Sequence, residues 1–163
     1  MSGIRRCACG AVVIVSFWAQ SARPAEKAEA GPSAPQKAAV REAAPISLQR
    51  YADAEVQKSP WGTIRWLMNS KIDRRAEMTL GVVEIAPRQS NPLHVHPNSA
   101  EYLHVLAGSC EHRVGDKWVR VKAGDTLRIP QGVPHMARTA KEACRAMILY
   151  DTGERQMVPV EEK

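Results

Sequence analysis

The stretch that decides the fold is Pro92–Gly108, which reads PLHVHPNSAEYLHVLAG. His94 and His96 are two residues apart, so in an extended strand both imidazoles point to the same face. The turn-forming segment Pro97–Ser99 follows, and the chain can reverse its direction there before Glu101 opens the next strand. Two neutral imidazoles and one carboxylate that converge inside a sheet are a suitable ligand set for a divalent metal ion.

A fourth ligand candidate lies downstream, in the stretch Gly124–His135 (GDTLRIPQGVPH). His135 follows a Val-Pro pair that restrains the backbone as it approaches the next strand. Taken separately the pieces mean little, because an isolated His-x-His is most often a pair of surface histidines and a Pro-x-Gly turn is only a turn. Their order and close spacing favour one metal site, with the ligands His94, His96, Glu101 and His135.

Together these residues resemble the two sequence motifs of the cupin superfamily. The first motif, G-x5-H-x-H-x4-E-x6-G, is matched by His94, His96, Glu101 and Gly108. The second, G-x5-P-x-G-x2-H-x3-N, is matched by Gly124, Pro130, Gly132 and His135. The chain departs from the pattern where Arg88 replaces the leading Gly and Thr139 replaces the final Asn. Neither position is a metal ligand in the family; the first departure concerns a loop conformation and the second a hydrogen bond.

The resemblance implies an all-β fold, a double-stranded β-helix or jelly-roll barrel, with one divalent transition metal inside it. The metal would be Fe, Mn, Ni, Cu or Zn, and it would be bound by the four ligands named above. Four protein ligands leave one or two coordination positions open if the metal is five- or six-coordinate, and open positions are typical of catalytic sites. The resemblance also implies a homodimer and a small-molecule ligand or substrate. The resemblance further implies that Glu101 could act as a catalytic base.

The spacing of apolar residues and turn formers predicts the same fold without the resemblance. Short strands are expected at residues 61–68, 76–86, 100–106, 109–114, 117–121, 126–129, 135–139 and 143–151. Gly115-Asp116 is expected to form a two-residue hairpin turn, and Gly81 a bulge. The barrel interior is expected to be apolar and to favour a small, partly hydrophobic ligand. It would be lined by Leu80, Val82, Leu103, Val105, Ile129 and Ile148.

Strand alternation separates the remaining ring-bearing residues from the ligand set. His104 lies an odd number of positions from Glu101, so it should face away from the metal, and Tyr102 should do the same. His112 is ambiguous in the pattern, and we expect it to be solvated.

The N-terminal 45 residues predict export. Residues 1–21 contain Arg5 and Arg6 followed by a short apolar run, as in a signal peptide, although a buried N-terminal segment or an uncleaved anchor is the alternative. Residues 22–45 are rich in Ala, Pro, Lys and Glu and predict a disordered linker. The cupin domain would then occupy residues 46–160 of a periplasmic or secreted protein. There Cys110 and Cys144 could form a disulfide or be two separate core residues.

The composition excludes other classes of function. Among 163 residues, 23 Lys and Arg oppose 17 Asp and Glu, for a net charge of +6. The basic residues are scattered, which argues against a nucleic-acid partner. No apolar run reaches the length of a membrane span, so no stable membrane insertion is expected after signal cleavage.

Four interpretations of function remain open. The leading one is an exported metal-binding cupin that acts as a metal-dependent dioxygenase on a small organic substrate. The second is a non-redox metal-dependent lyase, isomerase or decarboxylase, and the third is a non-catalytic module that binds or senses a small ligand. The fourth is a barrel with vestigial histidines, and the complete ligand set counts against it. The fold alone does not decide among them.

Overall fold

The computed structural model describes residues 45–161. The expected signal peptide (1–21) and all but the last residue of the expected linker (22–45) lie outside the described residues. The described part contains a single 3-10 turn, Tyr51–Asp53, and is otherwise built of strands and loops. None of its helices is long and apolar enough to cross a membrane.

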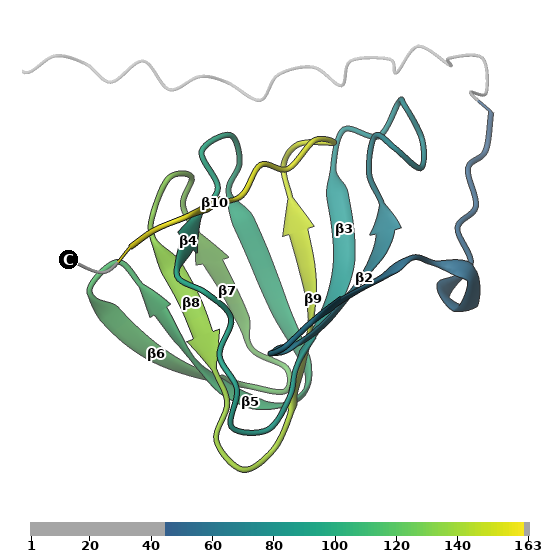
Figure 1. The fold of residues 1–163 in the computed structure, drawn as a ribbon. Helices are drawn as coiled ribbons and strands as arrows, with labels where there is room; N and C mark the ends of the chain where they lie inside the picture. Colours follow the sequence, from purple (N-terminus) through teal and green to yellow (C-terminus); the bar gives the residue numbers. More distant parts are fainter. Residues whose placement is uncertain (1–44, 162–163) are drawn as a thin grey trace, which may run out of the picture. The chain divides into compact units, whose positions relative to one another are not determined.

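Ten strands follow one another along the chain, and most of them occupy the stretches predicted from the sequence (Figure 1). The strands are β1 (Val56–Ser59), β2 (Gly62–Met68), β3 (Thr79–Ile85), β4 (His94–Val95), β5 (Glu101–Val114), β6 (Lys117–Lys122), β7 (Thr126–Ile129), β8 (His135–Arg138), β9 (Cys144–Tyr150) and β10 (Val158–Pro159). The sequence did not predict β1 or β10. It also predicted two strands where β5 is continuous.

Strand β5 belongs to both walls of the barrel. Its first part, from Glu101 to Gly108, pairs with β9, and the first four residues of that part also pair with β7. Its second part, from Ser109 to Val114, pairs with β6 and β8. One sheet therefore runs β1-β2-β3-β9-β5-β7 and the other β10-β4-β8-β5-β6, and every pairing is antiparallel. Figure 1 shows the two walls, and they form the predicted jelly roll.

Gly108 allows β5 to pass from one wall to the other. Its φ is 73°, in the left-handed region that favours glycine. A Cβ at this position would lie 1.9 Å from the carbonyl oxygen of Ala143, so no side chain fits there. The strand bends at Gly108 without ending, which explains why the sequence pattern predicted a break.

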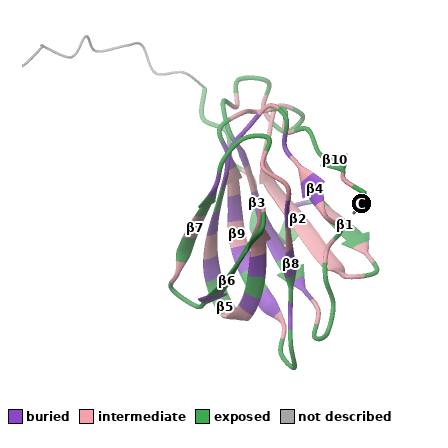
Figure 2. Cartoon of the chain, turned by 90° about the vertical axis from the view of Figure 1, so that its left-hand side faces the viewer, coloured by how far each residue is buried: buried purple, intermediate pink, exposed green. Residues whose placement is uncertain are grey.

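The core lies between the two walls, and buried residues form stripes along β3, β5 and β9 (Figure 2). Leu103, Val105 and Ile148 belong to the central apolar cluster, as predicted. On β3 the cluster residues are Val83 and Ile85, so the expectation of Leu80 and Val82 was wrong. Val82 is also buried, and this strand therefore gave no alternation from which its inward face could be chosen.

The predicted bulge at Gly81 lies on the opposite strand. The register shifts in β2, between Trp66 and Met68, where β2 faces Gly81 and Leu80. Gly81 lies beneath the indole of Trp66, because a Cβ added there would come within 3.0 Å of Cε3. The glycine is thus explained by close packing against an aromatic ring.

The two departures from the cupin motifs meet in one loop. Arg88 adopts a φ of 58°, the conformation that a glycine would take most easily. Thr139 ties down the same loop, because its hydroxyl donates to the carbonyl of Ala86 at 2.5 Å and accepts from the backbone N–H of Gln89 at 3.2 Å. Arg88 itself donates its backbone N–H to Ala140 at 2.7 Å. Thr139 and Arg88 thus both take part in holding this loop.

The loop conformation makes a prediction about Arg88, whose side chain is exposed. Arg88→Gly should raise the free energy of unfolding by about 1 kcal/mol, because glycine adopts positive φ without strain. Arg88→Val should lower it, because a β-branched residue tolerates this region least. Urea denaturation of the metal-free protein measures both changes. A glycine variant less stable than the valine variant would show that the loop does not hold this conformation.

Candidate metal centre

The four predicted ligand residues meet at one point inside the barrel. Their ligand atoms all lie within 4.8 Å of one another, and all four residues are buried. His94 and His135 are direct cross-strand partners on β4 and β8. His96 follows β4, and Glu101 is the first residue of β5. Three neighbouring strands of the fold therefore bring together residues that are as many as 41 positions apart.

Backbone carbonyl groups orient all three imidazoles. Nδ1 of His94 lies 2.8 Å from the carbonyl oxygen of Pro92. Nδ1 of His96 lies 2.6 Å from that of Gln156, and Nδ1 of His135 lies 2.9 Å from that of Val133. A carbonyl oxygen only accepts hydrogen bonds, so each Nδ1 must carry the proton. Each Nε2 is then left with a lone pair, which is the form that binds a metal.

The remaining donor atoms fit a cation and do not satisfy one another. One carboxylate oxygen of Glu101, Oε2, lies 3.1 Å from Nε2 of His96 and 3.1 Å from Nε2 of His135. To hydrogen bond with this oxygen, both rings would need a second proton and would become imidazolium ions in a buried site. Three imidazole lone pairs and one carboxylate around one point instead match the ligands of a divalent transition metal.

The pKa values keep the site in its metal-binding form. Burial opposes ionisation of Glu101, but the imidazoles of His135 and His96, whose Nε2 atoms lie beside the carboxylate, outweigh burial and hold the pKa of the carboxyl well below its usual range. Burial, assisted by the neighbouring His135, lowers the pKa of His94 to about 4. At neutral pH the carboxylate is therefore charged and His94 is neutral, so neither must lose a proton before a metal binds.

His104 and Tyr102 lie outside the cluster, as the alternation of β5 predicted. The Nδ1 atom of His104 lies 2.9 Å from the hydroxyl of Thr126 on β7. The hydroxyl of Tyr102 accepts a hydrogen bond from Arg128 at 3.2 Å.

His112 is buried, so the expectation that it is solvated was wrong. Only 2% of its surface is exposed, and it lines the cavity next to the ligand set. A bulge in β5 is the reason. Val105 and Ala107 pair with consecutive residues of β9, which leaves Leu106 as an extra residue. Before the bulge the side chains of odd-numbered residues point inward, and after it those of even-numbered residues do.

Three of the four clustered residues, His94, Glu101 and His135, line a cavity of about 250 Å³. His112 and Tyr150 contribute polar groups to its walls, and Arg155 contributes a cation. Burial raises the pKa of Tyr150 well above 10, and the charge of Glu101 adds to the effect, so the phenol stays protonated. Sequence reasoning named none of these three residues as part of the site. Most of the other lining residues are apolar, among them Ile64, Val83, Ile85, Leu103 and Ile148.

Cys110 and Cys144 lie side by side on β5 and β9 as buried free thiols. A hydrogen bond joins the two thiols, and together with burial it raises the pKa of Cys110. A disulfide between them remains a prediction.

Comparison with known proteins agrees with this geometry. Residues 81–150 match the Cupin domain family. The chain therefore contains a cupin domain and has the fold of the cupin superfamily. Germin-like protein 3-7 of Oryza sativa subsp. japonica is 35% identical over 91 residues, which cover 50% of this chain and 39% of the rice protein. The tetracenomycin polyketide synthase protein TcmJ of Streptomyces glaucescens is 31% identical over 96 residues, covering 59% of this chain and 62% of TcmJ.

Solved cupin structures share the fold at low identity. An oxalate decarboxylase of Lactobacillus farciminis superimposes with a TM-score of 0.62 and 21% identity, covering 67% of this cupin and 34% of the decarboxylase. The polyketide cyclase RemF of Streptomyces resistomycificus gives a TM-score of 0.60 and 24% identity, covering 72% of this cupin and 87% of RemF. The cupin described here thus spans well under two thirds of the rice germin-like protein and of the decarboxylase.

The cluster predicts which histidines control metal content. His96→Ala should lose most of the bound metal, because it removes one of four donors. His104→Ala is the matched control on the outer face of β5 and should retain the metal. Elemental analysis of both purified variants, after loading with zinc and removal of the excess, measures the difference. Equal metal loss in the two variants would contradict the assignment of the ligands.

Burial of His112 predicts how stability depends on pH. Burial lowers its pKa to about 4 from the ordinary value of 6.5. Between these values the unfolded chain binds a proton that the folded chain does not, so stability falls as the pH falls from 6.5 towards 4. His112→Phe should flatten this dependence by up to about 1.4 kcal/mol per pH unit. Denaturation of the metal-free protein at several pH values tests this, and an unchanged slope would show that His112 titrates normally.

Proposed function

We propose that this cupin binds one divalent transition metal through His94, His96, Glu101 and His135 and acts as a metal-dependent dioxygenase on a small organic substrate. The observation that carries the proposal is the set of four converging donors, three of which line a largely apolar cavity. Four protein ligands leave room in the coordination sphere of Fe, Mn, Ni or Cu. The open positions would bind substrate oxygens or dioxygen and polarise them.

The protein residues supply positioning and charge in this scheme. The carbonyl groups of Pro92, Gln156 and Val133 fix the three imidazoles and so fix the direction of the open positions. The apolar walls exclude water from the cavity and favour the body of an organic substrate. Glu101 is held as a carboxylate, so it could accept a substrate proton as a base.

A non-redox reaction is the second candidate. The observation in its favour is the similarity to TcmJ, which is named as a polyketide synthase protein, together with the shared fold of the cyclase RemF. A lyase, isomerase or decarboxylase would use the same metal and the same base without consuming oxygen. A binding or sensing module would use the cavity without turnover.

We also propose that the protein is exported to the periplasm or secreted, and that it forms a homodimer. The support for export is the pattern of residues 1–21, in which Arg5 and Arg6 precede a short apolar run. The support for dimerisation is the family resemblance alone.

Oxygen consumption separates the two reaction classes. The Fe(II)-loaded protein should consume dioxygen when catechol, which offers two adjacent oxygens, is added in an oxygen-electrode cell. Glu101→Gln should reduce this uptake at least 100-fold, because it removes the charged ligand and the base, whereas His104→Ala should leave it unchanged. Product formation from the substrate at the same rate without oxygen would contradict the dioxygenase and support the second class.

A further inference from the structure

We propose that His112 and Arg155 recognise the ligand of the cavity and that this ligand is a small organic carboxylate with an apolar body. The inference rests on the proposed metal site and adds the chemical class of the molecule that binds beside it. Three observations carry it: a buried imidazole and an arginine that have no hydrogen-bond partner and no counter-ion, respectively, among residues 45–161, and the size and polarity of the cavity.

His112 needs a hydrogen-bond partner that the described part of the chain does not provide. Neither of its ring nitrogens has a partner within residues 45–161, although the side chain is buried. Buried polar groups are almost always hydrogen-bonded, because burial removes their contact with water. The ring stacks on that of His135 at an angle of 20°, with 6.0 Å between the ring centroids. A molecule bound next to the metal would therefore lie within reach of His112.

Arg155 contributes its positive charge to the same cavity. Its guanidinium lies 5.0 Å from the ring centroid of Trp66 and 5.2 Å from that of Tyr150, so cation-π contacts hold it in place. The ring of Tyr150 is in turn 4.8 Å from that of His96, which brings the arginine close to the metal ligands. Among the described residues no carboxylate forms an ion pair with Arg155.

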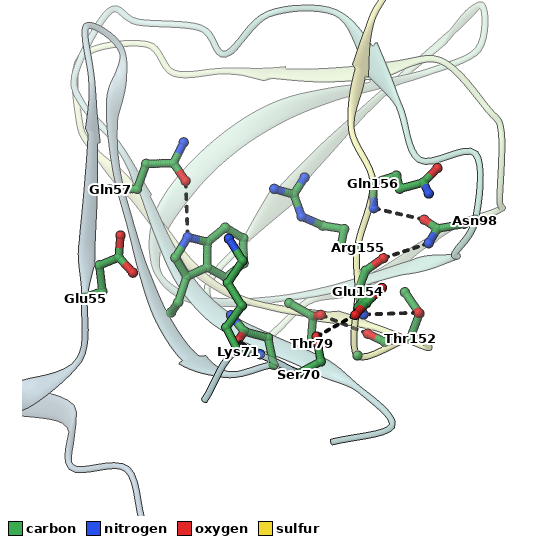
Figure 3. Close-up of a pocket in the computed structure, with 13 residues that line it drawn as sticks. Glu55, Gln57, Ser70, Lys71, Thr79, Asn98, Thr152, Glu154, Arg155 and Gln156 are labelled. Atoms are coloured by element: carbon green, nitrogen blue, oxygen red, sulfur yellow. Dashed lines mark hydrogen bonds between the residues drawn. The ribbon is translucent and has the colours of Figure 1, made fainter. Parts of the chain in front are cut away.

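Arg155 stands at the entrance of the cavity. It also lines an open polar pocket of about 660 Å³ on the surface (Figure 3). Figure 3 shows its side chain reaching from the segment next to Gln156 into the space beside Gln57. Gln57 and Arg155 line both the pocket and the cavity, so a ligand that enters from the surface would pass the guanidinium.

Charge and size define the ligand. The planar guanidinium matches a carboxylate, to which it can donate two parallel hydrogen bonds. A divalent metal would exceed the single negative charge of Glu101, and with Arg155 the cavity would favour an anion. The volume of the cavity is about 250 Å³. Pockets for drug-sized molecules typically have volumes of about 300–1,000 Å³, so the ligand must be small. The apolar walls fit a hydrocarbon body, and His112 fits a further oxygen or the second carboxylate oxygen.

Benzoate and benzamide are suitable probes, because they have nearly the same shape and differ in charge. Calorimetric titration of the zinc-loaded protein should show benzoate binding at least 10-fold more tightly than benzamide. Arg155→Gln should remove most of this preference. Arg128→Gln is the matched control, since Arg128 contacts the ring of Tyr102 on the outside of the barrel, and it should preserve the preference.

His112 is tested with the same titration. His112→Phe keeps the ring shape and removes the hydrogen bond, so it should weaken benzoate binding at least 10-fold while one zinc per chain remains bound. His112→Gln restores a hydrogen-bonding group and should recover part of the affinity. If His112 served only in packing, the hydrogen-bonding group of Gln would not restore affinity. Equal affinities of the Phe and Gln variants for benzoate would therefore overturn the assignment of His112.

The remaining outcomes separate this inference from the proposed function. A zinc-loaded protein that binds benzamide as well as benzoate, or neither, would overturn the carboxylate assignment while the metal site stands. Failure to bind zinc would overturn the proposed function. The titration would then be repeated on the metal-free protein, where loss of the benzoate preference in Arg155→Gln supports the role of this arginine and its persistence refutes that role.

Discussion

The structure depends on the geometry of three imidazoles whose protons are fixed by backbone carbonyl groups. Because each Nδ1 faces a carbonyl oxygen, each Nε2 must present a lone pair to the same point that Glu101 approaches with a negative charge. These donors repel one another unless a cation lies between them. The sheet pairings around the site hold them in place, and His94 and His135 are themselves direct cross-strand partners.

The C-terminal segment completes this arrangement. Strand β10 pairs with β4, with Val158 opposite Val95, and so holds the chain end against the strand that carries the first ligand. The same segment provides the Gln156 carbonyl that orients His96 and the Arg155 side chain that faces the cavity. A single stretch of irregular chain thus contributes both to the metal ligands and to the proposed recognition of the substrate.

The sequence predicted the jelly roll and the convergence of His94, His96, Glu101 and His135 because both rest on local rules. His94 and His96 share a face by alternation, and the spacing of the motifs identifies Glu101 and His135 as their partners. The inward position of His112 could not be predicted, because it depends on the bulge at Leu106, which no residue type marks. On β3 both faces are buried, so alternation could not select Val83 over Val82.

Arg155 was missed for a different reason. It lies outside any strand, and its contacts with Trp66 and Tyr150 join parts of the chain that are distant in sequence. No spacing rule connects such residues. Arg88 shows a different case, in which a residue that departs from the motif adopts the positive φ that suits a glycine.

The most direct test is X-ray diffraction from crystals of the zinc-loaded protein, recorded on both sides of the zinc absorption edge. The account predicts one strong anomalous peak per chain, about 2.0–2.2 Å from Nε2 of His94, His96 and His135 and from a carboxylate oxygen of Glu101. A fully occupied zinc ion elsewhere, or no zinc between these four side chains in protein loaded with excess metal, would contradict it.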